Sequence, residues 1–160
     1  MSDRWLDIFD RIQSETSSRV AAVAAEQLDD PTPCGDWNIR ALHNHLIEIN
    51  LQYAAIAGGK EPVADGLDHV GSDHVLVYTA AAGAAREAFA RPGMLEQTYD
   101  FPWGQEPGWT IVRHVCNELL IHTWDLSRAT GQSTDLVPDY VPESLSSWRA
   151  WFDSMGDSGT

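Results

Sequence analysis

The stretch Ile111–Gln132, IVRHVCNELLIHTWDLSRATGQ, constrains the fold most, because its apolar residues recur with the spacing of one amphipathic helix. Three polar side chains on it, His114, Glu118 and His122, follow one another every fourth residue. Neighbours at that spacing share a helix face, so Glu118 and His122 can hold one ion between them. His114 lies roughly 12 Å along the axis from His122, too far for the two to share that ion easily.

The helix face with Glu118 and His122 also carries apolar side chains, which indicates that it points into the protein. These apolar residues are Ile111, Val115 and Leu119. An unpaired charge inside a protein is costly, so a buried carboxylate beside an imidazole needs a reason. Two interpretations stay open. One is a satisfied hydrogen bond or a solvated helix edge, and the other is a metal site completed by a third ligand elsewhere.

The composition is that of a globular protein, since 43% of the 160 residues are hydrophobic and 21% are charged. This length is enough for one core, so we expect residues 1–155 to form a single domain and residues 156–160 a disordered tail. The net charge of −14 and the pI near 4.5 argue against binding to nucleic acid or to an anionic membrane surface, because both need a basic footprint.

The cellular compartment is predicted from the cysteines and from the N-terminus. Two cysteines, Cys34 and Cys116, make no disulfide framework, so a reducing compartment is the default. The first residues, MSDRWLDIF, lack the basic and apolar regions of a signal peptide. No apolar stretch approaches the roughly 20 residues that a membrane span needs. We therefore expect a cytoplasmic protein without a membrane segment.

Helical spacing of apolar residues recurs along the rest of the chain and is interrupted by proline and glycine. The other predicted helices are residues 4–28, Asn38 to the Gly58–Gly59 stop, 69–90 and 142–152. Between them we expect a loop at 60–67, a loop or short hairpin at 94–108 and a linker at 133–140. The pattern therefore predicts an all-α protein with four long helices and a short C-terminal helix.

A possible third ligand lies on the second predicted helix. His45 sits on the edge of the apolar stripe of that helix, whereas His43 is about 200° round and is predicted to face solvent. A core histidine hydrogen-bonded to a carbonyl is the alternative for His45. His69 and His74, in the first turns of the third predicted helix, are expected to be solvated, although His69 could approach the site from a loop.

Two further groups have candidate roles. Cys34 lies in a proline-rich turn with no clear neighbouring base, so we interpret it as a packed thiol near the site. The aromatic residues Tyr99, Phe101 and Trp103 either plug one end of the bundle or wall a pocket, and the sequence does not separate these alternatives.

Two segments resemble a known family. TPCGDWNIRALHNHL (32–46) and NELLIHTWDLSRATGQ (117–132) are similar to the DinB-like superfamily. More closely, they resemble the N-terminal domain of mycothiol-dependent maleylpyruvate isomerase and related actinobacterial metal-binding proteins. The resemblance covers residues 5 to 152 or so. It implies an up-down-down-up four-helix bundle of the DinB/YfiT-like type, with a long crossover between the second and third helices.

The resemblance implies a divalent ion, most often zinc or nickel, with iron and manganese still open. By position its ligands fall on His45, Glu118 and His122. Three protein ligands leave positions for water or substrate, which suits catalysis better than a closed structural site. Asp125 matches the W-D of the family, and it either orients a ligand or anchors Arg40 or Arg128. A purely structural salt bridge is the interpretation we prefer for Asp125.

The expected function is a metal-dependent thiol transferase or isomerase, in which a small thiol such as mycothiol attacks a small electrophile. His43 or His114 would be a base or a substrate contact, and no catalytic residue is assigned. The isomerase carries a second, C-terminal domain, so we expect the groups that hold the organic substrate to differ here. The alternatives are a non-enzymatic metal-binding module or dimerising partner, and a metal-free bundle. A homodimer is possible.

Overall fold

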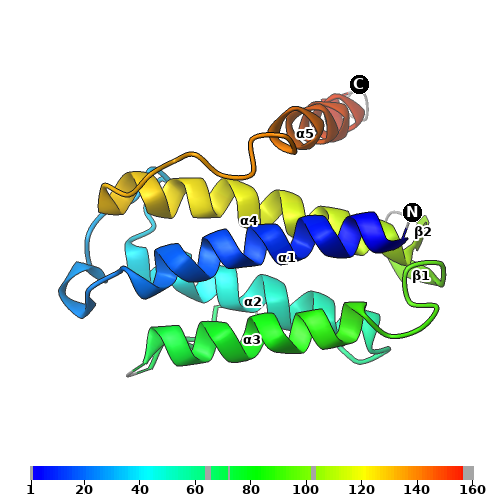
Figure 1. The fold of residues 1–160 in the computed structure, drawn as a ribbon, viewed down its shortest axis with the longest axis horizontal. Helices are drawn as coiled ribbons and strands as arrows, with labels where there is room; N and C mark the ends of the chain where they lie inside the picture. The colour runs from blue at the N-terminus through cyan, green and yellow to red at the C-terminus, as the bar shows by residue number, and fades with distance from the viewer. Residues whose placement is uncertain (1, 64–65, 72, 102–103, 157–160) are drawn as a thin grey trace.

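Four long helices lie side by side, as the ribbon in Figure 1 shows. They are α1 (Ser2–Ala21), α2 (Ile39–Ala57), α3 (His74–Phe89) and α4 (Gly108–Thr130). A hairpin of β1 (Thr98–Phe101) and β2 (Gly104–Pro107) precedes α4, and α5 (Val141–Gly156) follows it. This computed structural model describes residues 2–63, 66–71, 73–101 and 104–156.

The direction of the helices confirms the expected topology. In Figure 1, α1 and α4 run one way along the bundle and α2 and α3 run the other way. The crossover between α2 and α3 brings the chain back to the end where α2 began. Helix α1 packs against α3 and α4, and α2 packs against α3 and α4 as well. The bundle is therefore up-down-down-up, and the predicted hairpin lies before α4.

The predicted apolar stripes form the core between these helices. Phe9, Ile12, Leu42, Leu46 and Leu119 are fully or almost fully buried. Their burial supplies the main driving force for the packing of the bundle. Within the described residues, no helix combines the length and the apolar character that crossing a bilayer would require.

Helices α1 and α3 are shorter than predicted. Helix α1 was expected to reach residue 28 but ends at Ala21, and a 3₁₀ turn follows at Ala25–Gln27. The Gln27 side chain accepts from the Ala24 N–H and so begins the new turn. Helix α3 begins at His74 rather than at residue 69, because Asp73 caps its N-terminus by accepting from the Leu76 N–H.

The C-terminal helix is longer than predicted. Helix α5 continues to Gly156, whereas the apolar spacing predicted an end at residue 152. The expected disordered tail therefore begins after Gly156 at the earliest, and residues 157–160 lie outside the described part of the chain.

The prediction that His43 faces solvent is wrong. Its side chain is completely buried, its Nδ1 lies 3.0 Å from the Ile39 carbonyl oxygen, and its ring meets the edge of His74. The sequence stripe indicated one buried face of α2, but α3 and α4 pack on different sides of that helix. His74 and His69 are half-buried rather than solvated, and the Nε2 of His69 lies 3.6 Å from Glu48 Oε1.

Burial of His43 predicts a specific acid sensitivity. Desolvation lowers the pKa of His43 to about 4, although its contact with Ile39 opposes the shift. The unfolded chain takes up this proton below about pH 6.5, whereas the folded chain does so only near pH 4, so stability falls between these values. At pH 5 the loss is about 2 kcal/mol. In urea titrations at pH 7.5 and 5, His43→Gln should lose less stability than the wild type; parallel losses would refute this.

A close approach of backbone fixes the hairpin beneath α4. A Cβ on Gly108, the first residue of α4, would lie 2.0 Å from the carbonyl oxygen of Met94 and 3.0 Å from the Tyr99 ring. The Gly108 N–H donates to Gln97, and the Trp109 N–H donates to Leu95. Only glycine fits this position without a backbone shift.

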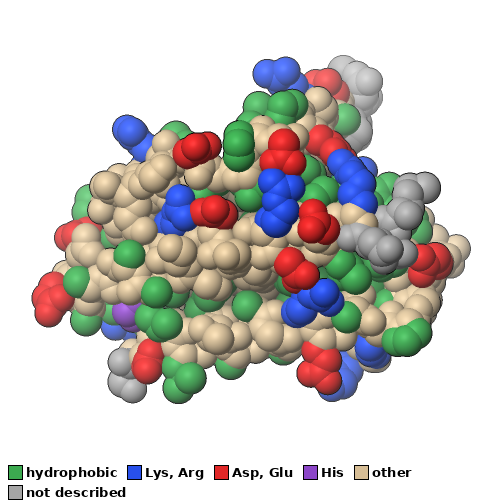
Figure 2. Space-filling view, in the orientation of Figure 1, with side chains coloured by type: hydrophobic (Ala, Val, Ile, Leu, Met, Phe, Trp, Pro, Cys, Tyr) green, Lys and Arg blue, Asp and Glu red, His purple; other side chains and the backbone are tan. Residues whose placement is uncertain are grey.

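Ion pairs connect α5 and the segment before it to α1. Arg4 pairs with Glu143 at the start of α5, and Arg11 pairs with Asp139. The face in Figure 2 shows acidic and basic side chains interleaved over this part of the molecule. Exposed pairs of this kind contribute little stability each, but together they favour one position of α5.

Candidate metal centre

The three predicted ligands meet where α2 packs on α4. The Nε2 of His45 lies 3.5 Å from Glu118 Oε2, and the Nε2 of His122 lies 3.5 Å from the same oxygen. The two imidazole rings are edge to face, with centroids 4.6 Å apart. One donor atom from each residue lies within 4.8 Å of the other two. All three side chains are half-buried.

These separations suit a shared cation better than hydrogen bonds. A normal N–H···O bond is about 2.7–3.2 Å long, shorter than either contact to Glu118. Two ligand atoms on one tetrahedral zinc ion, each about 2.1 Å from it, lie about 3.4 Å apart. The Nε2 of His45 is also buried without a hydrogen-bond partner, which is costly unless another group contacts it. The residues present therefore fit a divalent ion.

The electrostatics of Glu118 agree with this fit. Burial by itself would raise the pKa of Glu118, but the neighbouring imidazoles of His122, His45 and His114 lower it to about 2. The carboxylate is therefore anionic at neutral pH. A negative oxygen between two imidazole nitrogens is the donor set that zinc and nickel accept in proteins.

Asp125 contacts His122. Its Oδ2 lies 3.1 Å from His122 Nδ1 and 2.8 Å from the Cys34 sulfur. A carboxylate accepts hydrogen bonds, so a proton on His122 Nδ1 can be donated to Asp125, and Nε2 would then be the ligand atom toward a cation. The expected ionic contact of Asp125 is thus present, with His122 as its partner, and its role in orienting a metal ligand stays a prediction. Arg40 pairs instead with Asp68, and Arg128 lies over the ring of Trp124.

The expectation that Cys34 is a packed thiol near the site is confirmed. Its sulfur lies 3.7 Å from His122 Nδ1. Cys34, His122 and Asp125 form a second group close enough to share a cation. Burial and the adjacent Asp125 raise the pKa of Cys34 to about 12, so the thiol stays protonated and donates to the carboxylate. We therefore assign this group to positioning of His122 rather than to a second metal.

Aromatic and polar side chains surround the cluster. Trp37 lies over His45 and His122, with ring centroids 4.8 and 5.8 Å away. On the other side, the Nε2 of His114 lies 3.9 Å from Glu118 Oε1. Burial lowers the pKa of His114, although Glu118 opposes the shift, so its imidazole is neutral near pH 7. The ring of His114 lies 5.3 Å from that of Tyr53.

Two hollows open from the cluster. The first, of about 670 Å³, is lined by His45 and by polar groups of α2 and the crossover, among them Asn44 and Glu48. Glu48 accepts from the N–H groups of Gly66 and Leu67, and Asn44 accepts from those of His69 and Val70, so the crossover is fastened to α2.

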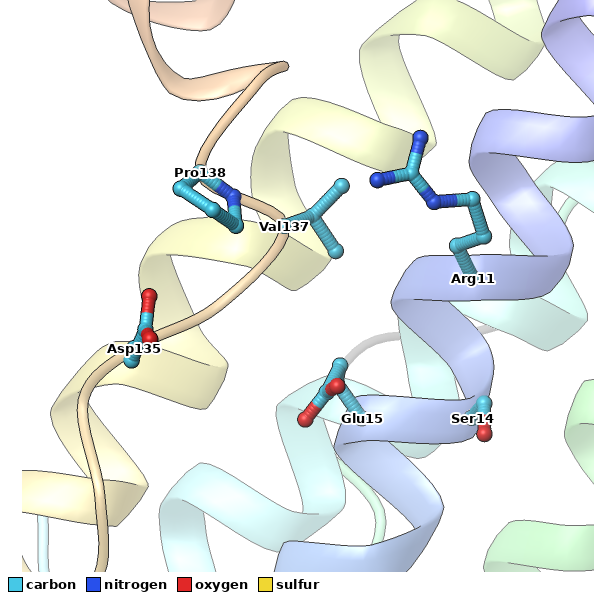
Figure 3. Close-up of a pocket in the computed structure, with 6 residues that line it drawn as sticks. All are labelled: Arg11, Ser14, Glu15, Asp135, Val137 and Pro138. Atoms are coloured by element: carbon cyan, nitrogen blue, oxygen red, sulfur yellow. The ribbon is translucent and has the colours of Figure 1, made fainter.

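The second hollow lies between α4 and α5, where Glu118 and His122 form part of its wall. Its volume is about 430 Å³. A third hollow, of about 330 Å³, lies between α1 and the segment before α5 (Figure 3). The charged groups Arg11 and Glu15 in that third hollow already pair with Asp139 and Arg19.

Replacing Asp125 should weaken metal binding without unfolding the bundle. In Asp125→Asn, the neutral amide holds the His122 ring less firmly, and we expect roughly 10- to 100-fold lower zinc affinity. Competition with a chromogenic chelator measures this affinity. Asp29→Asn, at an exposed site, is the control and should bind zinc as the wild type does. Equal affinity in all three proteins would show that Asp125 does not orient the ligand.

The fold and the cluster define a class of protein: a four-helix bundle with two imidazoles and one carboxylate between its second and last long helices. The sequence model of the mycothiol maleylpyruvate isomerase N-terminal domain family matches residues 9–127, more than half of the chain. The chain belongs to this family. The resemblance inferred from the two sequence segments is thereby confirmed.

Comparisons with other proteins identify relatives by sequence and solved structures with the same fold. Uncharacterized proteins from two strains of Mycobacterium tuberculosis are 40% identical over 143 residues, which is 88% of this chain and 75% of theirs. The crystal structure of the mycothiol-dependent maleylpyruvate isomerase superposes with a TM-score of 0.66 at 12% identity. A histidine-to-alanine mutant of that isomerase gives the same TM-score at 11% identity. This chain spans 60% of the isomerase, and the match covers 79% of this chain.

The structure separates the remaining candidate site residues into core residues and neighbours of the cluster. His43 is enclosed in the core, so it is neither a base nor a substrate contact. Tyr99 is buried and donates to the Ala57 carbonyl, and Phe101 packs against the core, so these two plug the end of the bundle. Trp103 lies outside the described residues.

Trp37 and Trp148 are neighbours of the cluster that were not predicted from the sequence. Helical spacing does not show where a turn or a separate helix folds back onto the bundle.

Proposed function

We propose that the protein binds one divalent ion, zinc or nickel, through His45, Glu118 and His122. The buried Nε2 of His45, which has no hydrogen-bond partner beside an anionic Glu118, is the observation that carries this proposal. The donor set leaves room for a further ligand. A bound ion of this kind lowers the pKa of a thiol that contacts it, so that a thiolate is available at neutral pH.

We propose further that the activity is transfer or isomerisation with a small polar thiol of the mycothiol type. The larger hollow beside His45 suits that thiol, because amide and carboxylate groups line it. Among the remaining residues, His114 is placed to take up the thiol proton. Its Nε2 is close to Glu118, and its imidazole is neutral near pH 7.

In a transfer, the sulfur forms a bond to an electrophilic carbon, and the bond from that carbon to its leaving group breaks with both electrons going to the leaving group. The thiol proton passes to His114 Nε2 and then to water. In an isomerisation, the sulfur adds to a double bond, the resulting single bond rotates, and the sulfur leaves again. Family membership supports these reactions, and the thiol and substrate are assigned here as proposals.

The test is thiol consumption. Protein freed of metal and then reloaded with zinc or nickel is mixed with mycothiol and 1-chloro-2,4-dinitrobenzene, and the coloured thioether is followed. We expect rates above the uncatalysed reaction with at least one metal, and loss of that rate with a chelator. Bound metal without turnover of this electrophile or of maleylpyruvate would overturn the enzymatic proposal and leave a metal-binding module.

A further inference from the structure

The hollow between α4 and α5 differs chemically from the one beside His45. Its walls are largely apolar and aromatic, and Glu118 and His122 stand at one side of it. The apolar lining residues are Ile121, Leu145, Trp148 and Phe152. Leu145 and Phe152 are 49% and 58% exposed, so a large apolar area faces water directly beside the reactive cluster.

The size and position of this hollow suit a small molecule. Its volume of about 430 Å³ falls within the range of about 300–1,000 Å³ found for ligand pockets. An occupant would contact Glu118 and His122, whereas the other hollow is lined by His45. Two reactants could therefore approach one cluster from two separate hollows.

The lining of this hollow suits an apolar molecule better than a small dicarboxylate. Arg149 is the one arginine or lysine among the lining residues, so it could pair with only one of two carboxylates. An apolar group placed against Leu145 and Phe152 would instead be removed from water, which is favourable.

We propose that this hollow binds the electrophile, and that it selects an apolar electrophile of aromatic size over a small dicarboxylate such as maleylpyruvate. The inference rests on the proposed function, because it names the second reactant of that reaction. With 1-chloro-2,4-dinitrobenzene, the sulfur bonds to the ring carbon that carries chlorine. Chloride then leaves with the electron pair of the broken bond, and the thiol proton is released to water.

Two leucines of nearly equal exposure give a matched test. Leu145 lines the proposed electrophile hollow, and Leu67, which is 50% exposed, lines the hollow beside His45. In Leu145→Asp we expect the KM for chlorodinitrobenzene to rise roughly tenfold and the KM for mycothiol to stay within about twofold. Leu67→Asp should leave the KM for chlorodinitrobenzene unchanged. Wild-type kcat/KM should be higher for chlorodinitrobenzene than for maleylpyruvate.

A binding measurement separates this inference from the proposed function. Equilibrium dialysis with unreactive 1,3-dinitrobenzene needs no turnover, and Leu145→Asp should bind it roughly tenfold more weakly than the wild type and Leu67→Asp. If Leu145→Asp binds dinitrobenzene more weakly but the wild type shows no turnover, the binding site is supported and the proposed enzymatic function is overturned. If the protein turns over the electrophile and its KM is equal in both variants, the proposed binding site is overturned and the enzymatic function is supported. No dinitrobenzene binding, or a dimer that Leu145→Asp dissociates without changing that binding, also overturns it.

Discussion

Glu118→Gln should lose its divalent ion and at least about 100-fold of the thiol-transfer rate, because glutamine keeps the shape of the side chain but removes the negative charge. Oε2 of Glu118 is the atom that both His45 and His122 approach at 3.5 Å. A neutral amide binds divalent cations weakly, and its NH₂ group can occupy the position of that oxygen. Mass-spectrometric metal analysis of the purified protein, together with the initial rate, measures both effects.

Two control variants show whether the effect belongs to this cluster. Glu48→Gln lies three residues from His45, and its remaining carbonyl oxygen can still accept from Gly66 and Leu67, so metal content should be unchanged. His114→Ala should also keep the metal, because His114 approaches the other oxygen of Glu118. Its rate should nevertheless fall, since the proton acceptor is removed. Full metal content in Glu118→Gln would disprove the proposed ligand set.

Gly108→Ala should destabilise the protein by about 3 kcal/mol, the second large effect expected. The new Cβ would lie 2.0 Å from the Met94 carbonyl oxygen, so the backbone of the hairpin or of α4 must move. That movement would disturb the hydrogen bonds from Gly108 to Gln97 and from Trp109 to Leu95. Urea unfolding at pH 7.5 measures the change in the free energy of unfolding.

Gly83→Ala is the matched control on α3. Nothing lies within 4 Å of a Cβ at Gly83, which is exposed, and alanine is the better helix former there. The substitution should stabilise the protein by up to about 1 kcal/mol. If both alanine variants changed stability equally, the close approach at Gly108 would not explain the loss.

Much of the fold was predictable, because long helices with regular apolar spacing carry a strong local signal. The stripe with Leu42 and Leu46 and the face with Val115 and Leu119 are buried as expected. The Asn38 cap was also expected from sequence, and its side chain accepts from the Ala41 N–H. The resemblance supplied the helix directions, which spacing alone does not contain.

The wrong or missing predictions concern side chains whose position is set by tertiary packing or by a single hydrogen bond. His43 was assigned to solvent because one stripe was taken as the only buried face, whereas α2 is covered on two sides. Asp125 also accepts from Cys34, a contact across 91 positions of the sequence that helical spacing does not show. Likewise, the Trp148 ring lies 6.1 Å from that of His114. The sequence of the linker before α5 does not indicate that α5 packs against this part of α4.

The fastening of the crossover to α2 has a thermodynamic consequence. Asn44 and Glu48 hold the crossover that forms one wall of the hollow beside His45, and they belong to the same helix as His45. If a molecule in that hollow strengthens zinc affinity by some factor, zinc must strengthen the affinity for that molecule by the same factor. Titrations performed in either order would then report one coupling energy, and the crossover is the part of the chain where substitutions should change it.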